Sequence, residues 1–123
     1  MALSLPPTCA PEDHAPGAQV PSVSPHAIDR AARIFRALGE PSRLRLLTLL
    51  ARGPACVSAV ALAEGEELST ISQRLRVLRA EGLVSRRRRG KHIEYGLADQ
   101  HVADLVQNAL AHAAEPRHFN HSD

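Results

Sequence analysis

The stretch that decides the fold is STISQRLRVLRAEGLVSRRRRGKHIEYGL, residues 69–97. Its first half repeats apolar side chains at helical spacing, and Gly82 follows where that helix should end. Its second half alternates apolar and polar side chains around an Arg89-Gly90 turn, as two antiparallel strands do. The stretch therefore predicts a helix followed by a β-hairpin. The helix is expected over 69–81, and the strands over 83–87 and 92–97.

Three more helices are expected before this stretch and one after it, because apolar side chains recur there at helical spacing and Gly or Pro marks the ends. Gly65 lies in the short polar turn between the third and fourth helices, as a helix-turn-helix motif requires. A helix-turn-helix followed by a β-hairpin is the layout of a winged helix DNA-binding domain. The expected fold class is therefore mostly α with a small β-hairpin, a winged helix-turn-helix. The remaining helices are expected over 26–39, 41–52, 55–64 and 99–114.

Length and composition indicate one small domain. The chain has 123 residues and only 2% aromatic residues, so its core must consist of Leu, Val, Ile and Ala. Six of the nine prolines fall within residues 1–25, where helix periodicity is almost absent, and this predicts a disordered N-terminal arm. The ordered domain is expected over 26–116, followed by a flexible tail over 117–123.

A homodimer is expected, because a domain of this size is only marginally stable alone and a second copy would bury more apolar surface. Two apolar stripes are too large for the surface of a small monomer and are candidates for the interface. They consist of Ile34, Phe35 and Leu38 on the first helix and of Leu105, Val106 and Leu110 on the last.

The sequence favours a cytoplasmic location. It contains no apolar run long enough for a membrane span. Residues 1–10 lack the basic and apolar regions of a signal peptide. Two cysteines do not make a disulfide framework.

Positive charge is concentrated in one segment, although the net charge is only +2. Eight of the fifteen Lys and Arg residues fall between 74 and 91, where only Glu81 opposes them. Such a segment on a balanced chain indicates a polyanion partner, here double-stranded DNA. The helix over 69–81 would lie in the major groove, and the hairpin would contact phosphates or the minor groove. The expected DNA contacts are Ser69, Thr70, Ser72, Gln73 and Arg74 on the helix and Arg86, Arg87, Arg88, Arg89 and Lys91 on the hairpin.

Four potential metal ligands, Asp99, His101, His112 and Glu115, belong to the last helix. The two histidines are eleven residues apart, so they share nearly one helix face but lie roughly 16 Å apart along the axis. Because a zinc–nitrogen bond is only about 2 Å long, one helix cannot bring both to one ion. Two antiparallel copies could, with Asp99 and His101 of one chain beside His112 and Glu115 of the other. Asp99 and His101 converge only if Asp99 is the N-cap. The alternative is a surface helix with a capping Asp and solvated histidines.

The chain resembles the ArsR/SmtB family of metal-responsive bacterial repressors. Four segments carry the resemblance in the order of the family. They are RALGEPSRLRLLTLLARGPACV (36–57), STISQRLRVLRAEGLV (69–84), RRRRGKHIEYGLAD (86–99) and HVADLVQNALAHAAE (101–115). The resemblance implies a winged helix homodimer with its interface on the first and last helices. It also implies that the metal-free dimer binds an inverted-repeat operator and that metal binding releases the DNA.

The same resemblance implies the ligand set. Members that sense zinc, and sometimes cobalt or nickel, through the last helix use an Asp-x-His pair from one chain and a His with a His or Glu from the other. Asp99, His101, His112 and Glu115 match all four positions. Nitrogen and oxygen ligands suit tetrahedral Zn²⁺ and are poor for thiophilic ions. We therefore expect Zn²⁺, with Ni²⁺ or Co²⁺ as alternatives if His118 and His121 of the tail add ligands.

A second family site is incomplete in this chain. Thiolate-rich members place two cysteines two residues apart on the third helix, but here the sequence is Cys56-Val57-Ser58. Other members join a Cys at this place to a Cys and a His of the N-terminal arm and to an acid three residues on. Cys9, His14 and Cys56 match the first three positions, whereas Ala59 occupies the fourth. Glu12 or Asp13 is a possible replacement.

Two other function classes would use some of the same residue types. A thiol-based redox-sensing repressor would use Cys9 and Cys56. A metalloenzyme would need an open coordination position and a substrate cleft, and a four-ligand site between helices offers neither. The chain is therefore not expected to be an enzyme.

Overall fold

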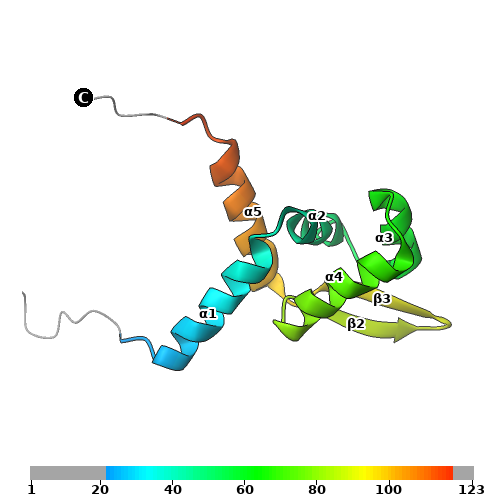
Figure 1. Cartoon of the computed structure of the whole chain (residues 1–123), viewed down its shortest axis with the longest axis horizontal. Helices are drawn as coiled ribbons and strands as arrows, with labels where there is room; N and C mark the ends of the chain where they lie inside the picture. Colours follow the sequence, from blue (N-terminus) through cyan, green and yellow to red (C-terminus); the bar gives the residue numbers. More distant parts are fainter. Residues whose placement is uncertain (1–21, 118–123) are drawn as a thin grey trace, which may run out of the picture.

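A computed structural model describes residues 22–117 as five helices and a three-stranded antiparallel sheet (Figure 1). This confirms the expected winged helix-turn-helix fold. The elements are α1 (Pro25–Leu38), α2 (Pro41–Leu50), β1 (Ala55–Cys56), α3 (Val57–Glu64), α4 (Leu68–Ala80), β2 (Val84–Arg89), β3 (His92–Leu97) and α5 (Gln100–Ala114).

The core is aliphatic, as the composition requires. Ile71, Leu75 and Leu78 lie on one face of α4 at spacings of four and three residues, and all are at most 1% exposed. They pack in one cluster with Leu46 and Leu47 of α2, which are fully buried. This packing fixes α4 against the rest of the domain and leaves its other face exposed.

The sheet has a strand that the sequence did not predict. Residues 55–56 form β1 rather than the start of a helix, and they pair with Tyr95 and Glu94 of β3, so the strand order is β1-β3-β2. A strand of two residues has no alternation to recognise, and it exists only because β3 offers it a partner. The helix α3 consequently begins at Val57 instead of Ala55.

The hairpin is also longer than predicted. β2 extends to Arg89, which pairs with His92, so the turn consists of Gly90 and Lys91 and not of Arg89 and Gly90. Gly90 has a φ of 62°, which glycine adopts without steric cost. All four consecutive arginines therefore belong to one strand.

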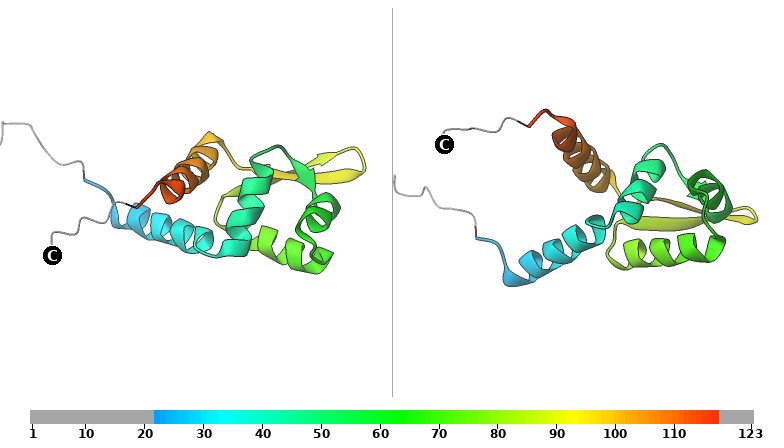
Figure 2. Two further views of the ribbon diagram at one scale, coloured as in Figure 1. Left: turned by 90° about the horizontal axis from the view of Figure 1, so that it is seen from above. Right: turned by 45° about the horizontal axis from the view of Figure 1, so that its top comes forward.

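The helices α1 and α5 extend from one end of the domain, and the tip of the β2–β3 hairpin lies at the opposite end (Figures 1 and 2). Ile28 and Phe35 on α1 are 57% and 60% exposed, and Leu110 on α5 is 38% exposed. Val106 was expected to share this surface, but it is only 2% exposed and belongs to the core of the protomer. None of the helices in the described part of the chain is long and apolar enough to cross a membrane.

Candidate DNA-binding surface and metal ligands

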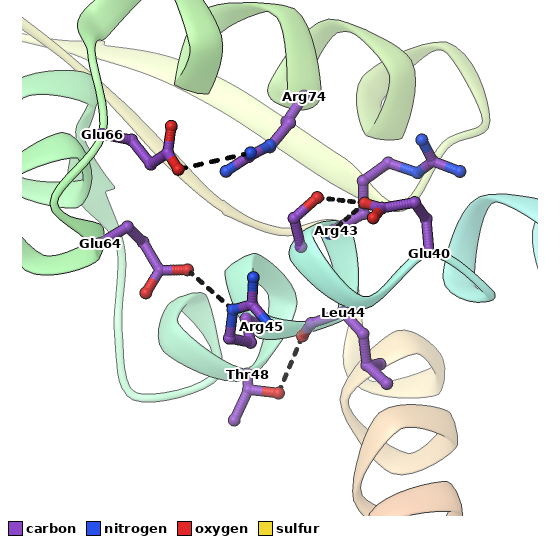
Figure 3. Close-up of polar contacts among 9 residues, drawn as sticks. Glu40, Arg43, Leu44, Arg45, Thr48, Glu64, Glu66 and Arg74 are labelled. Atoms are coloured by element: carbon purple, nitrogen blue, oxygen red, sulfur yellow. Dashed lines mark hydrogen bonds and ion pairs between the residues drawn. The ribbon is translucent and has the colours of Figure 1, made fainter.

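The turn between α3 and α4 is held by a left-handed glycine and an ion pair. Gly65 has a φ of 63° and ends α3. Beyond it, Oε1 of Glu66 lies 3.7 Å from Nη2 of Arg74 (Figure 3). Oε1 of Glu64 lies 3.9 Å from Nε of Arg45, which connects α3 to α2. The first contact links the turn to α4, and the second links α3 to α2.

Most of the helix residues expected to contact DNA are exposed. Ser69, Ser72 and Gln73 are accessible to solvent, whereas Thr70 is half-buried. Arg74 differs, because its side chain is only 22% exposed and its guanidinium lies against Glu66. Of the five residues, the three exposed ones are therefore the best placed to reach a partner.

The hairpin presents its basic residues on two faces. All five are exposed, namely the four consecutive arginines 86–89 and Lys91. Arg86 lies opposite Tyr95 in the strand register, and Arg87 lies opposite Glu94. Nη1 of Arg89 is 3.5 Å from Oε1 of Glu94. Because successive side chains of a strand point to opposite faces, Arg86 and Arg88 share one face of the hairpin, and Arg87 and Arg89 share the other.

A groove of about 590 Å³ separates α4 from the hairpin. Arg76 and Arg79 line it from α4, and Arg86 and Tyr95 line it from the sheet. The DNA contacts expected from the sequence do not include Arg76 and Arg79, although both belong to the basic segment over 74–91. Their spacing of three residues, and of four from Ser72 to Arg76, was a usable signal that they share a helix face.

The four candidate metal ligands form two pairs, one at each end of α5. Oδ1 of Asp99 is 3.8 Å from Nδ1 of His101, and Nδ1 of His112 is 3.8 Å from Oε2 of Glu115. Asp99 is the N-cap of α5, as the convergence of the first pair requires. The side chains are open to solvent, at 97% exposure for His101 and 88% for His112.

The donor set fits a divalent ion. Each pair combines one imidazole nitrogen with one carboxylate oxygen, and two donors on the same ion lie within about 4 Å of each other because each bond is about 2 Å long. Within residues 22–117 of one protomer, however, no three His, Cys, Asp or Glu side chains gather at one place. A complete set of four would need both pairs, and hence two chains.

Cys56 is half-buried and is the N-cap of α3. Its Sγ atom lies 3.3 Å from Oγ of Ser58. This hydrogen bond, followed by one from the backbone of Ala59, lowers the pKa of the Cys56 thiol below its usual value. Cys9 and His14, which the second site would require, lie outside the described residues, as do His118 and His121 of the tail.

Comparison with known proteins identifies the family. The family model described as "Bacterial regulatory protein, arsR family" matches residues 40–86. A "Transcriptional repressor SmtB homolog" from Synechocystis sp. is 42% identical over 79% of this chain and 77% of its own length. The "HTH-type transcriptional regulator NmtR" of Mycobacterium tuberculosis is 45% identical over 79% of this chain and 80% of its own length.

Solved structures agree. The homodimeric winged helix-turn-helix domain of a possible ArsR-family regulator from Mycobacterium bovis is 35% identical with a TM-score of 0.71, covering 84% of this chain and all of that one. The solution structure of apo-NmtR is 38% identical with a TM-score of 0.64, covering 85% of this chain and 92% of that one. The fold, the family model and the relatives lead to one conclusion. The chain belongs to the ArsR family of bacterial transcriptional regulatory proteins.

Proposed function

We propose that the protein is a metal-sensing transcriptional repressor that acts as a homodimer. The metal-free dimer binds an inverted-repeat operator through α4 and the β2–β3 hairpin. A divalent ion bound between the α5 helices of the two protomers favours a dimer geometry that fits DNA poorly, and the repressor is released. The observation that carries the proposal is the pair of exposed His–carboxylate sets at the two ends of α5.

The proposed metal site combines both chains. Two α5 helices packed antiparallel bring Asp99 and His101 of one protomer to His112 and Glu115 of the partner subunit, and the two-fold axis generates a second site. We propose Zn²⁺ as the ion, since two nitrogen and two oxygen ligands suit its tetrahedral preference. Ni²⁺ and Co²⁺ are the alternatives, and further ligands that expand the coordination number toward six would favour them over Zn²⁺.

The proposed dimer rests on apolar surface. Ile28 and Phe35 of α1 and Leu110 of α5 are exposed in the protomer, on the two helices that extend away from the hairpin (Figure 2). The M. bovis domain of the same fold is homodimeric. Names of relatives support a metal response, for example the "Cadmium resistance transcriptional regulatory protein CadC homolog" of Staphylococcus aureus, 35% identical to this chain.

The proposed DNA contacts divide by task. Ser69, Ser72 and Gln73 face base edges of the major groove, and the hairpin arginines with Lys91 contact the backbone or the minor groove. Thr70 and Arg74 are less well placed to contact bases, since Thr70 is half-buried and Arg74 is paired with Glu66.

The decisive experiment is a DNA-binding titration of the metal-free protein. The affinity for a duplex that contains the promoter of its own gene is measured first in the presence of a chelator. It is then measured again with Zn²⁺, Ni²⁺, Co²⁺ and Cd²⁺, each added separately. We expect tight binding without metal and release by Zn²⁺. Allosteric couplings of this kind are typically worth about 1–3 kcal/mol, or roughly 5–150-fold in affinity. No effect of any of the four ions would refute the sensor, and no binding without metal would refute the repressor.

A further inference from the structure

The groove between α4 and the β2–β3 hairpin is lined by three arginines, Arg76, Arg79 and Arg86. None of the residues that line it, all within the described part of the chain, is acidic. Arg76 donates a hydrogen bond from Nη1 to Oε1 of Gln73 at 3.3 Å. Among the described residues, none of the ion pairs involves Arg76, Arg79 or Arg86. The groove is therefore a concave surface with uncompensated positive charge.

The groove is built by the core that lies beneath it. Leu75, which is 1% exposed, anchors α4 and also forms part of the groove floor. Arg76 and Arg79 follow it on the neighbouring face of the helix. Arg86 and Tyr95 lie directly opposite each other in adjacent strands, so both side chains stand on the sheet face that meets α4.

Side chains of β2 alternate between the two faces of the sheet, so its four arginines lie in two different charge environments. Arg86 faces the groove, and Arg88, two residues on, shares its face. Arg87 lines a different hollow together with Glu94, on the side of the sheet towards α2 and α5. Arg89 is paired with the same carboxylate at 3.5 Å. Positive charge is thus partly neutralised on one face of the hairpin and left free on the face beside α4.

We propose that this groove binds a phosphate of the DNA backbone, at the point where a strand passes from the major groove occupied by α4 to the minor groove reached by the hairpin. This inference rests on the proposed DNA-binding function and adds Arg76 and Arg79 to its residues. A helix and a hairpin that occupy adjacent grooves must have a sugar–phosphate strand between them. Guanidinium groups hold phosphate oxygens through paired, charge-assisted hydrogen bonds. Such contacts set affinity and register and carry no sequence information.

Arg79→Ala tests the proposal. The probe is a 30-bp duplex of random sequence, whose binding depends on backbone contacts and needs no operator. Affinity is measured from about 50 to 200 mM salt, a range over which phosphate contacts dominate the change. The variant dimer should bind roughly a hundredfold more weakly at the lowest salt, about tenfold for the charged hydrogen bond lost in each of its two protomers. Because each dimer has two such grooves, the slope of log K against log salt should fall by about 1.8 for the two phosphates lost.

The matched control is Arg52→Ala, which removes one exposed arginine from a different groove, beside α3 and β1. It should leave the slope unchanged. Equal effects of the two variants would mean that only net charge matters and would overturn the proposal. A wild-type protein that binds no duplex would instead overturn the proposed function itself.

Tyr95 offers a direct view of the groove, because it is the only tyrosine of the chain. Protein labelled with 3-fluorotyrosine gives a single ¹⁹F resonance. At duplex concentrations that saturate each protein, the duplex should shift this resonance less in Arg79→Ala than in wild-type protein. A second titration with inorganic phosphate, at the same ionic strength, tests whether the groove binds a free phosphate ion instead of a DNA phosphate. A shift with inorganic phosphate but none with the duplex would overturn the proposal in favour of a small-anion site.

Discussion

Oδ1 of Asp99 lies 3.8 Å from Nδ1 of His101, in the first turn of the helix that Asp99 itself caps. The same oxygen accepts a hydrogen bond from the backbone N–H of Val102 at 3.1 Å. One carboxylate therefore stabilises the start of α5 and belongs to a candidate ligand pair. Oδ2 is not used by the cap, which leaves an oxygen for a metal ion.

Two substitutions of Asp99 separate these roles. Asn caps a helix as well as Asp does, whereas Ala does not. We expect Asp99→Ala to lower the stability of the metal-free protein by about 1 kcal/mol, or several degrees in Tm. Asp99→Asn should melt close to wild type yet bind Co²⁺ more weakly, because its amide is neutral. Thermal melts with chelator and Co²⁺ titrations check this. Equal metal affinity of Asp99→Asn and wild type would remove Asp99 from the ligand set.

The histidines should control the metal response without affecting DNA contact. His101→Ala and His112→Ala are expected to bind promoter DNA as wild type does without metal, and to stay bound when Zn²⁺ is added. Both side chains are almost fully exposed, so their loss costs the fold little. Cys56→Ser is the control and should still respond to Zn²⁺. If Cys56→Ser no longer responded to Zn²⁺ while both histidine variants responded normally, the regulatory metal site would be the N-terminal one.

Stoichiometry and spectroscopy test the same site independently. Symmetry predicts two ions per dimer. Bound Co²⁺ should give a tetrahedral spectrum without strong thiolate bands, since Asp99, His101, His112 and Glu115 contribute no sulfur. A six-coordinate spectrum that is lost on deletion of residues 117–123 would implicate His118 and His121 and would favour Ni²⁺ over Zn²⁺.

The order of helices and the hairpin were predictable because each is specified by local signals: apolar spacing, Gly65 at a turn and Asp99 at a cap. The proximity of the side chains within each His–carboxylate pair was predictable for the same reason, since each pair joins residues two or three apart. β1 and the arginine groove were not, because they depend on segments well separated in sequence, such as Cys56 with Glu94 and Arg79 with Tyr95. The strand alternation of residues 86–89 already places Arg86 and Arg88 on one face and Arg87 and Arg89 on the other. A count of positive charges alone does not separate the two faces.

Gln73 should carry sequence preference. It is exposed on α4, and glutamine can pair with adenine in the major groove. Gln73→Ala is expected to weaken binding to the promoter duplex by about 1–3 kcal/mol while leaving binding to a random duplex nearly unchanged. Gln107→Ala, which removes an exposed glutamine from α5, is the control. Competition assays with the two duplexes check this. Equal losses on both would assign Gln73 to the backbone instead.

The dimer should depend on Phe35. This side chain is 60% exposed in the protomer although it is large and apolar. Phe35→Glu would place a charge in the proposed interface, where burial without a partner is costly. We expect wild-type protein to sediment as a dimer at micromolar concentration without metal, and Phe35→Glu as a monomer.

Leu62→Glu provides the matched control for Phe35→Glu. Leu62 is 85% exposed but lies on α3, away from the end of the molecule that α1 and α5 form (Figure 1). The control variant should remain dimeric. If wild-type protein sedimented as a monomer, or if both variants dissociated alike, the proposed interface would be wrong.

Glu40 should make stability depend on pH. It is the N-cap of α2, and its Oε2 accepts hydrogen bonds from the Ser42 hydroxyl and, at 3.1 Å, from the backbone N–H of Arg43 (Figure 3). The Ser42 hydrogen bond is the main cause that lowers the pKa of Glu40 below its ordinary value of 4.5. A carboxylate whose pKa is lower in the folded protein stabilises it above the unfolded pKa, and this contribution is lost as pH falls through the folded pKa.

Glu40→Ala should therefore lower Tm by a few degrees at pH 7, and the difference from wild type should shrink as pH falls below 4.5. The control is Glu67→Ala, because Glu67 also precedes a helix but makes no side-chain cap hydrogen bond. It should change Tm little at pH 7. Thermal melts of the three proteins between acidic and neutral pH give the comparison. A difference between Glu40→Ala and wild type that stayed constant down to the lowest pH would show that the ionised carboxylate is not what stabilises α2.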